Sequence, residues 1–177
     1  AEAKELLLRA VGEYPHNLGE GKLESGQENN LYYLLGLVQE KLGEAKDAFE
    51  SLTRACCGES EPVGMMYYND QPPEMIYYQG LAYRMLGEEE QAVRRFQKLV
   101  DYGREHIRDD VKIDYFAVSL PDLLIFEENL NERNRKHCLF MMSLGLKGLG
   151  RIDEAEKCAE ELLAMDNAHQ EIRVHDL

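Results

Sequence analysis

Residues 73–100, PEMIYYQGLAYRMLGEEEQAVRRFQKLV, decide the fold of this chain. In this stretch Gly80, Gly87 and Ala92 are separated by seven and then five positions. The same spacing recurs at two other places, as Gly36, Gly43 and Ala48, and as Ser143, Gly150 and Ala155. A small residue inside a helix admits a second helix at close range, and a glycine just past a helix end adopts the left-handed C-cap conformation. Each copy therefore predicts two antiparallel helices joined by a tight turn.

Apolar residues recur at helical spacing along both predicted helices of each copy. In the first copy they are Tyr32, Leu35, Val38 and Leu42, then Ala45, Ala48, Phe49, Leu52 and Ala55. In the second copy they are Ile76, Leu81, Tyr83 and Leu86, then Ala92, Val93, Phe96, Leu99 and Val100. In the third copy they are Leu139, Met142, Leu146 and Leu149, then Ala155, Ala159, Leu162 and Leu163. These residues are the predicted core of an all-α chain.

The three copies resemble tetratricopeptide repeats, whose signature of 34 residues has a bulky residue at position 4, small residues at 8 and 20, and alanine near 27. The first copy has Tyr32, Gly36, Ala48 and Ala55 at those positions. The resemblance implies an all-α fold, an α-α superhelix of helical hairpins, whose first helices line a concave face that binds a protein or peptide.

The expected organisation is a single domain over residues 1–177 that contains insertions. Gly36 and Gly80 are 44 residues apart, and Gly80 and Ser143 are 63 apart, so about 10 and 29 residues are inserted relative to an uninterrupted array. The expected segments are repeats at 29–57, 73–105 and 136–166, inserted helices at 106–130 and a tail at 167–177. Residues 1–15 match the second helix of a repeat, so we expect the chain to be a piece of a longer protein.

Composition and charge exclude several classes of function. Acidic residues outnumber basic ones 34 to 20, which gives a net charge of −14 and a pI near 4.8. Such a charge repels phosphate backbones and anionic lipid, so nucleic acid and membranes are not expected partners. The chain lacks the run of about 18 apolar residues that a membrane helix needs. Its four cysteines have no CxxC spacing, which favours a reducing, cytoplasmic location.

Catalytic, cofactor and metal sites are not predicted. The glycines of LGEGKLESG, from Leu18, lack the order of a phosphate-binding loop. His137, Cys138 and Cys158 lack a fourth metal ligand at a suitable spacing. The expected function is a non-catalytic scaffold for protein–protein interaction, which packs on its own upstream module or on a partner.

The candidate binding surface is the concave face of the repeats. The resemblance places these residues on it: Tyr33, Leu37, Tyr77, Leu81, Arg84, Phe140 and Lys147. An aromatic residue recurs at one position of every copy, as Tyr33, Tyr77 and Phe140, and such rings can anchor a partner through their large area. The alternative is that the three rings pack against the inserted loops.

A narrower resemblance suggests a second function. The strings MMYYNDQPPEMIYYQGLAYR, from Met65, and YFAVSLPDLLIFEENLNERNRKHC, from Tyr115, are similar to the C-terminal helical-repeat region of large bacterial proteins. The N-terminal part of those proteins resembles a β-rich, carbohydrate-active-enzyme module. This resemblance implies an accessory domain whose loop at 62–73, with Tyr67, Tyr68 and Asn69, reaches into the active site of that enzyme.

Overall fold

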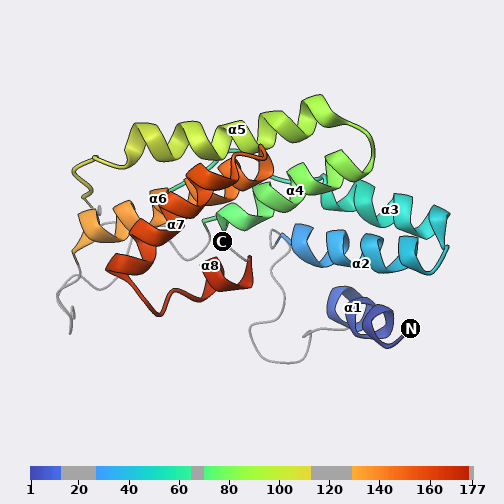
Figure 1. The fold of residues 1–177 in the computed structure, drawn as a ribbon. Helices are drawn as coiled ribbons and strands as arrows, with labels where there is room; N and C mark the ends of the chain where they lie inside the picture. The colour runs from blue at the N-terminus through green and yellow to red at the C-terminus, as the bar shows by residue number, and fades with distance from the viewer. Residues whose placement is uncertain (13–26, 65–69, 113–128, 176–177) are drawn as a thin grey trace.

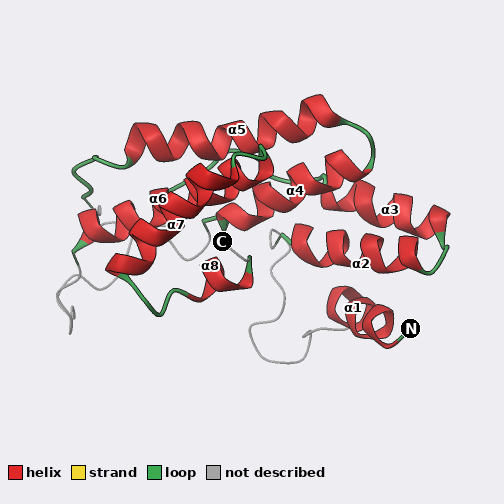
Figure 2. Ribbon diagram, viewed as in Figure 1, coloured by secondary structure: helices red, strands yellow, loops and turns green. Residues whose placement is uncertain are grey.

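The computed structural model describes residues 1–12, 27–64, 70–112 and 129–175. Within these ranges every regular element is an α-helix (Figure 2). The helices are α1 (Glu2–Gly12), α2 (Asn29–Lys41), α3 (Ala45–Ala55), α4 (Pro73–Met85), α5 (Glu89–His106), α6 (Leu130–Gly148), α7 (Ile152–Met165) and α8 (Gln170–Val174). The predicted all-α class is confirmed.

Three antiparallel hairpins stack side by side (Figure 1): α2 with α3, α4 with α5, and α6 with α7. The first helix of each later hairpin packs on both helices of the hairpin before it, so α4 contacts α2 and α3, and α6 contacts α4 and α5. Repetition of this step gives the tetratricopeptide-like superhelix that the sequence predicted. At the two ends of the chain, α1 packs on α2, and α8 turns back from the end of α7.

The turns inside the hairpins have the predicted C-cap geometry. Gly43, Gly87 and Gly150 have φ angles of 79°, 82° and 74°. In each turn the amide of the following residue donates a hydrogen bond of 2.8–2.9 Å to the carbonyl five residues earlier. This closure satisfies carbonyls that the end of a helix would otherwise leave unpaired, and it requires a residue that tolerates positive φ.

The main core is organised around Phe96 of α5, which is completely buried. Its ring lies against Gly80 of α4 and Gly148 of α6, where an added Cβ would collide with the ring. At Gly145 of α6 an added Cβ would lie 2.5 Å from the carbonyl oxygen of Phe96. The small residues therefore set the distance between α5 and its two neighbours.

Some side chains that the periodicity assigned to the core are exposed, which corrects the prediction. The exposed fractions are 45% for Leu42, 62% for Phe49 and 39% for Val93. Leu42 is the C-cap residue of α2. On the second helices, the buried stripe includes Ala48, Leu52 and Ala55 of α3, and Ala92, Phe96 and Leu99 of α5. Phe49 and Val93 directly follow the buried Ala48 and Ala92, so they point about 100° away from it.

The segments outside the hairpins differ from expectation in two places. The expected tail at 167–177 contains α8, whose Ile172 is completely buried in the main core. Helix α6 begins at Leu130, before the expected boundary at 136, because the Asn129 side chain accepts a hydrogen bond of 3.2 Å from the Glu132 amide and caps the helix. Most of the expected inserted helices at 106–130 lie outside the described residues.

Candidate interaction surface

The first helices of the hairpins carry aromatic rings on the face that the sequence predicted to be concave. The ring of Tyr33 on α2 lies 5.5 Å from that of Tyr78 on α4, and Tyr78 lies 5.8 Å from Tyr77. His175, which directly follows α8, lies 5.6–6.0 Å from the rings of Tyr77, Tyr78 and Phe140 of α6. Thus Tyr33, Tyr77 and Phe140, which the sequence predicted on one face, are joined into one surface by Tyr78 and His175.

Helix α8 covers the part of this surface that belongs to α4 and α6. Tyr77 and Phe140 are only 7% and 4% exposed, and they share the main core cluster with Ile172. The Lys147 ammonium donates a hydrogen bond to the carbonyl oxygen of His175. The structure therefore does not leave Tyr77 and Phe140 in an open groove, and the C-terminal segment contacts both of them.

Arg84 is exposed and Leu81 is partly buried, and both contact other parts of the fold. The Arg84 guanidinium donates to the Glu89 carboxylate at 2.7–3.2 Å and to the Gly148 carbonyl oxygen at 2.8 Å. It also lies over the Phe96 ring, 5.0 Å from its centroid. Arg84 thus ties α4 to the start of α5 and the end of α6, while Leu81 is partly buried against the main core. Both are engaged within the fold.

The open part of the concave face is at α2. Tyr33 and Leu37 are partly exposed there, next to the partly exposed Tyr78. Burial, with the Glu40 carboxylate as a smaller cause, raises the pKa of Tyr33. Burial also raises the pKa of Tyr77 to about 12 and that of Tyr78. The phenols are therefore neutral at physiological pH, and the surface offers flat rings and hydroxyl groups.

The loop candidates Tyr67, Tyr68 and Asn69 lie outside the described residues. The segment before them, residues 57–64, is held across the second hairpin by side-chain hydrogen bonds. The buried Gln79 amide donates to the Cys57 and Glu59 carbonyl oxygens, at 3.2 Å and 2.8 Å. The His137 ring Nε2 lies 2.8 Å from the Val63 carbonyl oxygen. The first insertion thus contacts α4 and α6.

These contacts also bear on the metal and thiol chemistry considered from the sequence. Burial lowers the pKa of His137, whose ring is engaged with a backbone carbonyl. Burial raises the pKa values of Cys56 and Cys138 to about 12, so these thiols are not nucleophiles at neutral pH. Among the residues that the structure describes, no group of three His, Cys, Asp or Glu side chains could hold a metal ion.

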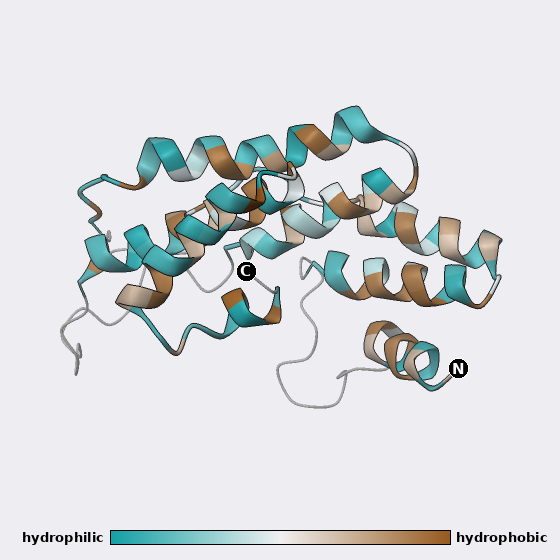
Figure 3. Ribbon diagram, in the orientation of Figure 1, coloured by the Kyte–Doolittle hydropathy of each residue, from teal (hydrophilic) through white to brown (hydrophobic). Residues whose placement is uncertain are grey.

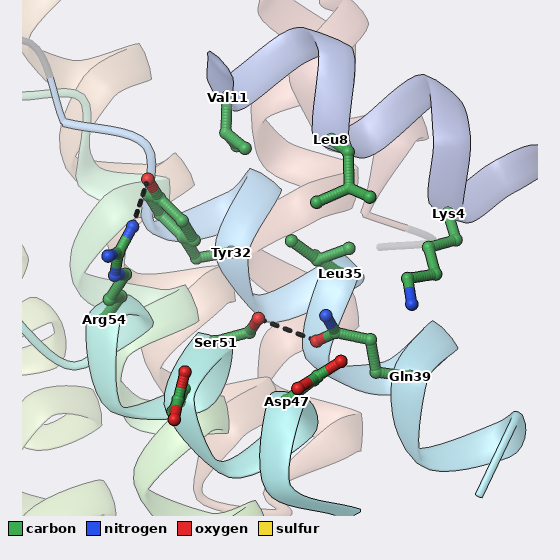
Figure 4. Close-up of a pocket in the computed structure, with 10 residues that line it drawn as sticks. Lys4, Leu8, Val11, Tyr32, Leu35, Gln39, Asp47, Ser51 and Arg54 are labelled. Carbon is green, nitrogen blue, oxygen red and sulfur yellow. Dashed lines mark hydrogen bonds between the residues drawn. The ribbon is translucent and has the colours of Figure 1, made fainter. Parts of the chain in front are cut away.

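A hollow of about 310 Å³ lies between α1, α2 and α3 (Figure 4). Helix α1 contributes Lys4, Leu8 and Val11, although none of its side chains is buried. Figure 3 shows hydrophobic bands along much of α1. Its polar lining includes Asp47, Glu50 and two hydrogen-bonded pairs: Ser51 with Gln39 at 2.7 Å, and Arg54 with Tyr32 at 3.3 Å. The hollow combines apolar and polar atoms, and its lining includes neither a histidine nor a cysteine.

Sequence reasoning missed the residues that complete the aromatic surface, Tyr78, His169, Ile172 and His175. The His169 ring lies 5.2 Å from that of Phe140, and its Nδ1 accepts a hydrogen bond from the Ile172 amide. Helix α8 has five residues, too few for a helical period to be recognised. Tyr78 directly follows Tyr77, and this adjacent pair of tyrosines was the sequence feature that could have indicated a role for Tyr78 in the aromatic surface.

The comparisons with known proteins agree with this geometry. The sequence model of the family Tetratricopeptide repeat matches residues 74–102, which cover most of α4 and α5. No solved structure matches the chain. None of the described helices is both long enough and apolar enough to cross a membrane. Residues 74–102 are therefore similar to a tetratricopeptide repeat, a family whose repeats generally mediate protein–protein interaction, and they lie within an all-α fold.

Proposed function

We propose that this chain is a non-catalytic scaffold that binds a protein segment along the concave face of α2, α4 and α6. The observation that carries the proposal is the row of aromatic rings on α2 and α4, which His175 joins to Phe140 of α6. Rings of this kind supply large contact area at little cost in side-chain entropy, and they recur among the residues that dominate binding energy. The partner is a polypeptide, either the upstream module of the same protein or a separate chain.

The open end of the surface at α2 is the entry for that segment. Tyr33 and Leu37 are partly exposed, and Leu34 beside them is 40% exposed. Tyr78 extends the same patch onto α4. A neutral aromatic and aliphatic patch in a chain of net charge −14 favours a partner segment with apolar side chains, flanked by basic rather than acidic residues.

The experiment places a photo-crosslinking amino acid, benzoylphenylalanine, at position 33 of the full-length protein in its native cells. A matched control carries it at position 49, because Phe49 is an aromatic residue exposed on a second helix. We expect a covalent adduct with a polypeptide at position 33 and none at position 49. Adducts at position 49 with none at position 33 would refute the proposal.

A further inference from the structure

The C-terminal helix α8 occupies the concave face as a bound peptide would. It is separated in sequence from α4 by more than 80 residues, yet His175 stacks with Tyr77 at 6.0 Å and with Phe140 at 6.0 Å. Figure 1 shows the chain leaving α7 and turning back, so that α8 lies below α4 in this view. Helices α4 and α6 belong to the binding face in the proposed function.

Three side chains attach α8 and its two flanking residues to this face. Ile172 is completely buried, the His175 ring contacts three aromatic rings, and the His169 ring lies 5.2 Å from that of Phe140. The remaining side chains of the helix are exposed: Gln170, Glu171, Arg173 and Val174. One aliphatic anchor and one ring, three residues apart, lie on the same side of a helix. This small number of anchors is typical of a short helical peptide in a groove.

Helix α8 depends on the groove for its helical conformation. Isolated helices shorter than about 12 residues are marginal in water, and α8 has five residues. Its start is closed by the His169 ring, and its Arg173 donates to the Asn167 carbonyl oxygen at 3.0 Å. Lys147 of α6 accounts for its last carbonyl. Once displaced from the groove, the segment would lose its helical structure.

One electrostatic contact opposes the docking of α8. The Glu74 carboxyl at the start of α4 is partly buried, and burial, with the Glu171 carboxylate as a further cause, raises its pKa. The negative charge of Glu171 on α8 therefore disfavours ionisation of Glu74 on α4, and this repulsion opposes the docking of α8.

We propose that α8 is an intramolecular ligand, and that the groove between α4 and α6 takes in its place a short helical segment of a partner protein. That segment carries an aliphatic residue and, three residues later, a flat ring, and it ends at a carbonyl that accepts from Lys147. This inference rests on the proposed function, because it defines how half of the same concave face becomes available.

The test uses the full chain and a fluorescent peptide with the sequence of residues 167–177, measured by fluorescence polarisation. Ile172→Asp in the chain removes the buried anchor of α8, and Val174→Asp is the matched control, since Val174 is 72% exposed on the same helix. We expect the Ile172→Asp chain to bind the peptide at least about tenfold more tightly than the wild-type and Val174→Asp chains. In the wild-type and Val174→Asp chains, the covalently linked α8 competes with the peptide at an effective concentration on the order of millimolar.

A folded Ile172→Asp chain, judged by circular dichroism, that binds the peptide no better than wild type would overturn the proposal. Hydrogen exchange of the wild-type chain decides the question if that variant does not fold. We expect the amide of His175, bonded to the Glu171 carbonyl at 3.2 Å, to exchange through local opening and much faster than the amides in the middle of α6. Equal protection of α8 and α6 would show that α8 opens only on global unfolding, which also overturns the proposal.

The two proposals fail separately. Crosslinks at position 33 with no peptide binding would leave the scaffold function intact and remove the role of α8. Peptide binding without crosslinks at position 33 would keep the groove between α4 and α6 and remove the proposed entry at α2.

Discussion

The replacement Gly145→Ala tests the idea that small residues set the distance between α5 and α6. An alanine Cβ would lie 2.5 Å from the Phe96 carbonyl oxygen, 2.7 Å from Val100 Cγ2 and 3.1 Å from Leu99 Cβ. Two of these contacts are far shorter than the roughly 3.5–4.0 Å that separates packed atoms. A backbone carbonyl cannot rotate away, so α5 and α6 must move apart by about 1 Å.

The expected size of the effect follows from two opposing contributions. Overpacking of a core costs about 1–3 kcal/mol, and the upper part of that range applies because a backbone atom is involved. Alanine gains about 1 kcal/mol over glycine in a helix interior. The net result is a loss of about 2 kcal/mol, which for a chain of this length lowers Tm by roughly 4–8 °C.

Thermal and urea unfolding, followed by circular dichroism, measure this loss. Gly12→Ala is the control, because nothing lies within 4 Å of a Cβ at Gly12 on α1. We expect Gly12→Ala to leave the free energy of unfolding unchanged or slightly higher. A Gly145→Ala chain as stable as wild type, or more stable, would refute the close-approach explanation.

Two further predictions concern buried titratable groups. Cys56 and Cys138, with pKa values near 12, should resist alkylation by iodoacetamide at pH 8 in the native chain, while the exposed Cys57 is alkylated. Mass spectrometry that finds equal labelling of all three cysteines would contradict this prediction. Glu74→Gln should stabilise the chain at pH 7 by about 0.5 kcal/mol, the size of one partly exposed charge pair, because it removes a carboxylate whose charge is disfavoured by burial and, to a smaller extent, by Glu171. Folding raises the pKa of the Glu74 carboxyl, so the stability of the wild-type chain falls as pH rises through that pKa. Urea unfolding at pH 4 should therefore show little of the stability gained by Glu74→Gln at pH 7. An equal gain at both pH values would contradict this prediction.

The hairpin turns could be predicted because their causes are local. A positive φ at Gly43, Gly87 and Gly150 is a property of one residue in its own turn. The close approach at Gly80 likewise follows from the absence of a side chain at one helical position. The position of Phe49 could not be obtained in this way, because its exposure depends on which helices surround α3.

The candidate site also has one part that the sequence could predict and one part that it could not. The sequence by itself determined that Tyr33, Tyr77 and Phe140 share a face, because equal positions in equal repeats point in the same direction. Only the tertiary structure decided that this face is partly filled, because the contact between Tyr77 and His175 joins residues almost 100 positions apart. A five-residue helix has no recognisable period, and a helix this short is marginal in water without tertiary contacts such as those of Ile172 and His175.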